Sequence, residues 1–161
     1  MRIYADRLSQ QNAANYGCYL VAGEEPLIKL ESIDNIRQQL QKQGLAEERL
    51  KFTFDADFQW PDIFDAMSEL SLFSQYRLVE LQLDRVPDKA IQNQLDELLQ
   101  LLNSETRFLL SVPKLTKANE KQNWYKFFDQ QGLVVMIYPP EGGQLKAWVR
   151  QRLGQQQVPA N

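Results

Sequence analysis

Residues 23–30 have part of the spacing of a phosphate-binding loop. Such a loop needs a glycine, four further residues and then Gly-Lys-Ser/Thr, so that backbone N–H groups surround the phosphates and the hydroxyl binds Mg²⁺. Gly23 and Lys29 stand in this register, but Ile28 replaces the second glycine and Leu30 replaces the hydroxyl residue. A branched side chain therefore occupies a position where the backbone must approach the phosphates closely. Taken alone, Lys29 is more typical of a solvated lysine on a helix.

The residues around this loop also oppose nucleotide chemistry. Glu24-Glu25 adds negative charge beside the phosphate position, and Pro26 has no backbone N–H to donate. The candidate for a metal-binding strand, residues 78–83, ends in Asp84-Arg85 rather than in paired acids. We therefore predict that nucleotide binding is absent or very weak, and we predict no catalytic residue, cofactor or metal ion.

A second candidate site is the apolar pentad Glu69-Leu70-Ser71-Leu72-Phe73, which follows a helical stretch and precedes a strand. Neighbouring residues on a helix lie about 100° apart, so one core-facing stripe does not easily bury Leu70, Leu72 and Phe73 together near a helix end. Large apolar side chains at a solvent-facing tip are typical of a surface that fits a pocket in a partner. The alternative is core packing at a helix–strand junction.

Composition excludes several classes of function. The 161 residues are 43% hydrophobic, enough for one domain with its own core. There is no histidine, which argues against triad hydrolases and zinc enzymes, and the single cysteine, Cys18, suggests a reducing compartment. The net charge of −3 predicts little nonspecific DNA affinity. No apolar run approaches the ~20 residues of a membrane span and no signal-peptide pattern is present, so we expect a soluble cytoplasmic protein without membrane contact.

Apolar periodicity predicts strands and helices in strict alternation. A continuous apolar run at residues 17–22 is typical of a strand buried on both faces, and Pro26 suits the first turn of a helix that Gly44 stops. The other expected strands are residues 50–55, 77–83, 106–112 and 133–138. The other expected helices are residues 6–15, 61–70, 91–102, 118–131 and 144–153.

This order predicts an α/β fold: a three-layer, open, parallel five-stranded sheet with helices on both faces. Residues 1–153 form one domain in this interpretation. Residues 154–161, rich in glutamine, form a linker toward further domains.

Five segments, in this order along the chain, resemble one family. They are Tyr19-Leu20-Val21-Ala22-Gly23, Glu25-Pro26-Leu27, Ser71-Leu72-Phe73, Lys114-Leu115-Thr116-Lys117 and Trp124-Tyr125-Lys126-Phe127-Phe128. The pentad that begins at Glu69 is also similar to the clamp-binding motif Gln-Leu-Ser/Asp-Leu-Phe, with Glu in place of Gln. Over its whole length the chain resembles the first, AAA+-like domain of the delta subunit of bacterial DNA polymerase III, the clamp-opening subunit of the clamp loader. For the aromatic helix we expect a place in the core.

The resemblance implies a P-loop NTPase-like fold with a degenerate nucleotide site and a role in DNA replication. It implies that the chain binds the DNA sliding clamp and helps to open the ring for loading onto primed DNA. Other loader subunits, which would be joined through the absent lid and collar domains, would supply ATP hydrolysis. The parent holoenzyme is a DNA-directed DNA polymerase, a nucleotidyltransferase, whereas this domain is expected to be non-catalytic. The residues that would contact the clamp are Met67, Leu70, Ser71, Leu72 and Phe73.

The basic residues Lys114, Lys117 and Lys121 are candidates for weak contacts with template phosphates in a loader. Lys117 and Lys121 would share a helix face. The alternative is an ordinary solvated surface, and the intervening Glu120 weakens the patch.

Other functions fit the same alternation of elements. A receiver-like phosphoacceptor domain would use Glu24-Glu25, Asp84 and Ser111, but Tyr138 stands where it needs a lysine. A working nucleotide kinase or ATPase is opposed by the loop, and an inactive P-loop scaffold without a clamp partner is the remaining alternative.

Overall fold

The computed structural model describes residues 1–69 and 75–137 of the chain. The expected anchors Leu72 and Phe73, with Leu70 and Ser71 beside them, lie outside the described residues. So do Tyr138, the helix expected at residues 144–153 and the linker expected at residues 154–161.

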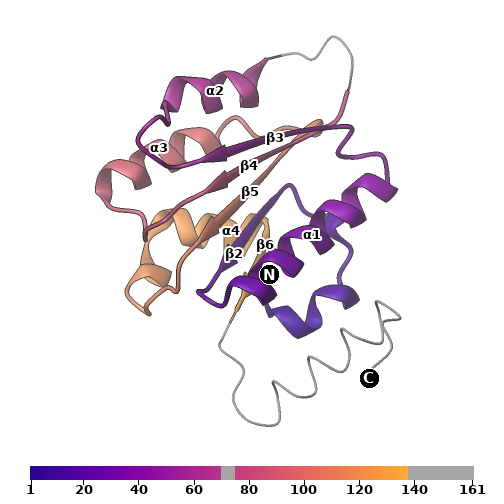
Figure 1. Ribbon diagram of the computed structural model, residues 1–161, viewed down its shortest axis with the longest axis horizontal. Coiled ribbons are helices and arrows are strands. Elements are labelled where there is room, and N and C mark those ends of the chain that lie inside the picture. Colours follow the sequence, from indigo (N-terminus) through magenta and orange to yellow (C-terminus); the bar gives the residue numbers. More distant parts are fainter. Residues whose placement is uncertain (70–74, 138–161) are drawn as a thin grey trace.

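One parallel sheet of six strands forms the centre of the protein, in the order β1-β6-β2-β5-β4-β3 (Figure 1). The prediction of five strands was one short, because the first strand is only three residues long and carries no alternation that a sequence can reveal. It is held at the edge by parallel pairing with β6. The strands are β1 (Arg2–Tyr4), β2 (Cys18–Ala22), β3 (Glu48–Thr53), β4 (Arg77–Gln82), β5 (Thr106–Val112) and β6 (Leu133–Met136).

Within the described residues, four α-helices follow the predicted ones with shifted ends. They are α1 (Pro26–Lys42), α2 (Trp60–Ser68), α3 (Lys89–Leu99) and α4 (Asn123–Gln131). Gly44 has a φ of 72°, a left-handed conformation that suits glycine just after a helix and confirms the predicted stop. In the part of the chain that the structure describes, none of these helices is both long and apolar enough to cross a membrane.

Two helix predictions were wrong in detail. The helix expected at residues 6–15 is a pair of 3₁₀ helices, η1 (Ala5–Gln10) and η2 (Ala13–Asn15), because the Asn12 side chain accepts from Ala14 N–H and starts a new turn. The helix expected from residue 118 begins only at Asn123, after the short η3 (Asn119–Lys121).

The sheet separates two hydrophobic cores, which confirms the three-layer architecture. On one face, α1 packs Ile28, Ile36 and Leu40 with the core that also holds Tyr19 and Val21 of β2. On the other face, α2, α3 and α4 cover the alternate side chains of the same strands. Strand β2 is buried along its whole length because both of its faces are covered.

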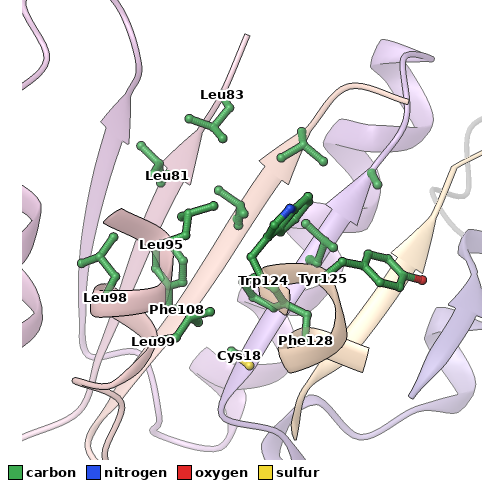
Figure 2. Close-up of a cluster of buried hydrophobic side chains, with 14 of the residues drawn as sticks. Cys18, Leu81, Leu83, Leu95, Leu98, Leu99, Phe108, Trp124, Tyr125 and Phe128 are labelled. Carbon is green, nitrogen blue, oxygen red and sulfur yellow. The ribbon is translucent and has the colours of Figure 1, made fainter. Parts of the chain in front are cut away.

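The aromatic residues of α4 lie in the second core, as expected. Figure 2 shows Trp124 and Phe128 next to Phe108 of β5, and Trp124 and Phe128 are both fully buried. Tyr125 is also buried, whereas Phe127 is only partly covered. All four aromatic residues pack in or against the same core, so they share one broad face of α4.

A buried ion cluster ties α1 to the sheet. Glu80, inside strand β4, accepts hydrogen bonds from Arg37 Nε at 3.0 and 3.1 Å and from Arg37 Nη2 at 2.6 Å. Arg49 of β3 reaches the same carboxylate at 3.2 Å, and Asp34 bonds the other side of the Arg37 guanidinium at 2.7 Å. The hydrogen bond to Glu80 is the main reason that the pKa of Arg37 is raised. A buried carboxylate is costly unless it is paired in this way.

Candidate functional site

The crevice at the carboxyl ends of β2 and β5 is the place where open α/β sheets bind ligands, because the helices that come after these two strands cover opposite faces. Here the chain's own groups bridge it. Gly23 N–H donates to Val112 O at 3.1 Å, and Lys29 Nζ donates to the same carbonyl at 2.8 Å. The lysine that stands in the register of a phosphate-binding lysine is thus bonded to the end of β5. Burial lowers the pKa of Lys29, and the nearby Glu24 opposes that shift.

Gly23 is required by the packing of this turn. Its φ is 155°, and a Cβ atom added there would overlap the carbonyl oxygen and Cβ of Ile137. Ile137 N–H in turn donates to Ala22 O at 2.8 Å. The end of β6 therefore closes against the same turn that would have to open around a phosphate.

The amino end of α1 is already occupied by a carboxylate. Glu25 is the N-cap, and its side chain accepts from Ile28 N–H at 2.6 Å, in the place that an anion would take at a helix N-terminus. Ile28 lies in the core, whereas Leu30 is exposed. The Ile28 N–H and the space at Gly23 are thus already used by the chain itself, and absent or very weak nucleotide binding stays a prediction. In residues 1–69 and 75–137 no group of three or more His, Cys, Asp or Glu side chains is placed to hold a metal ion.

The helix that leads to the pentad ends at Ser68, two residues earlier than predicted. Glu69 is its C-cap in an extended conformation, and its N–H donates to Asp65 O at 2.8 Å. The expectation that Met67 contacts a partner is corrected by the structure, because Met67 is only 1% exposed and packs in the core beneath α2. Its position on the buried stripe, one turn after Ile63, explains this placement.

A buried arginine fixes the end of α2. Arg77, the first residue of β4, is 5% exposed, and its Nη1 donates to Ala66 O at 2.9 Å. A cation at the carboxyl end of a helix satisfies a carbonyl and complements the helix dipole. No local pattern in the sequence singles out Arg77, because its partner lies on the preceding helix.

The strand side of the pentad is anchored as well. Arg77 N–H donates to Glu105 O at 2.9 Å, and Tyr76 O accepts from Glu48 N–H at 3.2 Å. The segment that contains the pentad leads into the amino end of β4, whereas the closed loop follows Ala22 at the carboxyl end of β2.

The three candidate lysines Lys114, Lys117 and Lys121 are exposed and come after β5. Lys117 lies in a turn in which Thr116 and Asn119 bond each other, and Lys121 lies in η3. The expected shared α-helix face for Lys117 and Lys121 is therefore not formed.

The sheet order contradicts the receiver-like alternative. That fold has the strand order 2-1-3-4-5, in which strand 3, the strand before the phosphoacceptor, pairs with strand 1. Here β5 lies between β2 and β4, so Asp84 is separated from Glu24-Glu25 by a whole strand. Asp84 is also paired with Arg85 at 2.8 Å, and Ser111 is buried within β5.

The model of the family described as DNA polymerase III, delta subunit, matches residues 19–137. The chain belongs to this family. It is 34% identical over 157 residues to the DNA polymerase III subunit delta of Escherichia coli (strain K12), covering 96% of the chain and 46% of that protein. It is 27% identical to the subunit delta of Haemophilus influenzae (strain ATCC 51907 / DSM 11121 / KW20 / Rd), covering 94% of the chain and 45% of that protein. The chain thus spans about half the length of these relatives.

Solved structures agree on the fold of this delta-family chain. The Bacillus subtilis DNA clamp loader delta protein superposes with a TM-score of 0.60 at 14% identity, over 94% of the chain and 46% of that structure. The Aeropyrum pernix ORC1 protein, solved in complex with DNA, superposes with a TM-score of 0.50 at 12% identity, over 94% of the chain and 48% of that structure. These matches place the sheet and its helices in the predicted AAA+-like fold.

Proposed function

We propose that this chain is the clamp-binding part of a clamp-loader delta subunit, which docks on the DNA sliding clamp and helps to open the ring. Family membership carries this proposal, because a delta-family chain with an apolar pentad at the end of α2 has the features of a clamp-docking surface. The chain spans about half the length of these relatives, and the proposal covers clamp binding only, not loader assembly.

The anchoring around residues 70–74 supports the pentad as the docking element. Met67 and Ala66 face the core, and the backbone leaves the helix at Glu69. Arg77 holds the other side of the segment. Rigid supports on both sides reduce the entropy that a docking segment loses when it binds. In this proposal Leu72 and Phe73 are the anchors, with Leu70 and Ser71 beside them.

The expected affinity is set by the two large side chains. Burying one such side chain contributes about 1.5–3 kcal/mol. Leu72 and Phe73 together would then contribute several kcal/mol, and replacing both by alanine would weaken binding about 100-fold or more. The ring opens in this scheme only if the chain binds an open clamp interface better than a closed one, because a ligand shifts a conformational equilibrium by its differential affinity.

The chain's own part in the reaction is binding rather than catalysis. The closed turn at Gly23, with Lys29 bonded to Val112 O, supports a subunit that leaves ATP hydrolysis to its loader partners and nucleotidyl transfer to the polymerase. Such work takes place in the cytoplasm, on primed DNA held by the full complex.

Isothermal titration calorimetry with the purified sliding clamp of the same organism tests the docking surface. The unmodified chain should bind, and Leu72→Ala/Phe73→Ala should abolish binding while its circular dichroism stays unchanged. A matched control is Leu27→Ala/Leu30→Ala, an exposed apolar pair at the start of α1, and this variant should bind the clamp normally. Loss of binding in both variants, or unfolding of the first, would contradict the assignment.

The exposed lysines after β5 are proposed as weak phosphate contacts within the loader complex. Changing Lys114, Lys117 and Lys121 to Gln should reduce the slope of log affinity against log salt for primed DNA by about 0.9 for each phosphate that is no longer neutralised. Fluorescence anisotropy of labelled DNA with the assembled loader measures this slope. An unchanged slope would mean that these lysines are ordinary solvated residues.

A further inference from the structure

A polar hollow of about 390 Å³ lies between α1 and the segment that holds η1 and η2. Figure 1 shows that segment, in indigo, alongside α1. All eight residues that line the hollow are polar, and Ser9 and Lys42 are two of them. We call it the amide hollow, because the other six carry carboxamides: Gln11, Asn12, Asn35, Gln38, Gln39 and Gln43.

Most of the carboxamide oxygen atoms are already used by the chain itself. Gln39 Oε1 accepts from Ala13 N–H at 2.7 Å, and Asn35 Oδ1 accepts from Gln39 Nε2 at 2.7 Å. Asn12 Oδ1 accepts from Gln43 Nε2 at 2.9 Å. The NH₂ groups of Asn12 and Asn35, in contrast, donate to no group among the described residues. The hollow therefore offers more donors than acceptors, and its ligand should bring acceptor oxygens.

The charge around the amide hollow favours an anion. Lys42 is exposed and forms no ion pair in the part of the chain that the structure describes. Residues 7–23 and 35–46 contain no Asp or Glu, although the net charge of the whole chain is −3. The carbonyl groups that end α1 would oppose an anion, but the chain engages them, as in the bond from Leu45 N–H to Leu40 O at 2.8 Å.

The donor set fits a phosphodiester better than a carboxylate. Carboxylates pair best with the bidentate fork of an arginine, and Arg37, the arginine on this part of α1, is bound to Glu80 instead. The phosphates of nucleic acids are contacted by Lys, Ser, Asn and Gln side chains, and all four types line the hollow.

The length of the donor row fits a polymer. Asn35 and Lys42 are seven residues apart, which is about 10.5 Å along the axis of α1 and longer than one phosphate group. Hydrogen bonds of this kind add little net affinity in water, and no apolar wall supplements them. A single free phosphate would thus be held weakly, whereas a strand with repeated phosphates engages several donors at once.

We propose that the amide hollow binds the phosphodiester backbone of a nucleic acid strand, whatever its base sequence. Lys42 Nζ neutralises one phosphate, and the NH₂ groups of Asn12 and Asn35 donate to phosphate oxygens beside it. This contact uses none of the residues proposed above for clamp docking or for phosphate contacts after β5. It therefore holds or fails independently of both.

NMR titration of the ¹⁵N-labelled chain with dimethyl phosphate tests the site, because side-chain NH₂ groups give signals of their own. At constant ionic strength the NH₂ signals of Asn12 and Asn35 should shift and saturate. The NH₂ signal of Asn103, which donates to Leu101 O outside the hollow, should stay in place. Oligo-dT should saturate the same shifts at a phosphate concentration about 10-fold lower, because its phosphates are linked.

Isosteric substitutions remove the donors and keep the bonds that hold the hollow together. Asn12→Asp/Asn35→Asp retains the two accepting oxygens, replaces both NH₂ groups by oxygen and adds negative charge, so it should abolish binding. Lys42→Gln should weaken oligo-dT binding about 10-fold and lower the slope of log affinity against log salt by about 0.7. The matched control Lys126→Gln removes the same charge from α4, on the other face of the sheet, and should change neither.

Four results would overturn the proposal. The first is that dimethyl phosphate leaves the NH₂ signals of Asn12 and Asn35 unmoved, and the second is that binding survives Asn12→Asp/Asn35→Asp. Equal shifts with acetate would assign the hollow to a carboxylate of a protein partner. Binding of dimethyl phosphate without binding of oligo-dT would exclude a nucleic acid. Calorimetry with the sliding clamp should give the same affinity for Asn12→Asp/Asn35→Asp as for the unmodified chain, which keeps this test separate from that of clamp docking.

Discussion

Removing Arg37 tests whether the buried cluster at Glu80 holds α1 on the sheet. The side chains of Arg37 and Glu80 are only 11% and 5% exposed, and three hydrogen bonds join them. Arg37→Met keeps most of the side-chain stem but leaves the carboxylate inside β4 with Arg49 as its remaining ion-pair partner. Breaking a buried ion pair costs about 3–5 kcal/mol. Because Arg49 stays in contact and is itself partly solvated, we expect the lower end, about 3 kcal/mol.

Urea denaturation followed by circular dichroism measures this cost. With a slope of about 2 kcal/mol per molar urea, the midpoint should fall by about 1.5 M. Asp34→Asn is the matched control, because Asp34 bonds the same guanidinium at 2.7 Å but from a side chain that is 46% exposed. That exposed pair should contribute about 0.5 kcal/mol or less.

A double variant separates the ion pair from simple packing. Arg37→Met/Glu80→Leu removes the uncompensated charge as well as its partner, so it should regain much of the stability that Arg37→Met loses. The reasoning is refuted if Arg37→Met costs no more than Asp34→Asn, or if the double variant is as unstable as the sum of its single changes.

Three other outcomes rest on the surroundings of single residues and on the closed loop. Gly23→Ala should lower the free energy of unfolding by about 2 kcal/mol or more, because the added Cβ would overlap Ile137. Gly17→Ala, with open space around it, should change that free energy by about 0.5 kcal/mol or less. Equal urea midpoints for the two variants would contradict this reasoning. Burial raises the pKa of the Cys18 thiol from 9.0 to about 12, so the native thiol should resist alkylation at neutral pH. The stability that this shift contributes is complete below pH 9.0 and is lost as the pH rises toward about 12, because only the unfolded thiol ionises in that window. Cys18→Ala should therefore reduce the decline of the free energy of unfolding between those two pH values. An unchanged dependence of that free energy on pH would argue against this role of Cys18. Millimolar Mg-ATP should leave the melting temperature unchanged, whereas a ligand present at 100 times its Kd would add about 2.7 kcal/mol.

Strong local patterns made much of the fold predictable. The continuous apolar runs of β2 and β5 are typical of strands that are buried on both faces of a parallel sheet. Strand β5 has the predicted bounds. Pro26 and Gly44 mark the limits of α1 through their own backbone preferences. The core role of Trp124 and Phe128 is explained by their size and position.

Features that depend on distant partners could not be read in the same way. Strand β1 forms because it pairs with β6, and its three residues are too few to show an alternation of apolar and polar side chains. Arg77 and Glu80 look like ordinary charged positions until the helices α2 and α1 supply a carbonyl and a guanidinium. The closed loop was predicted from its substitutions, but the capping role of Glu25 and the bond from Lys29 to Val112 O required the structure.

The pairing of β1 with β6 has a consequence for biosynthesis. Residues 2–4 are made first, but their partners in the sheet are residues 134–136. At about 5–20 residues per second a ribosome needs roughly 7–26 s to make the intervening chain. During that time the first strand has no ladder, and β2 lacks its neighbour on one side. The part of the sheet formed by β1, β6 and β2 can therefore be completed only after translation has passed residue 136. A nascent chain that stalls earlier would present an unpaired edge of β2 to chaperones.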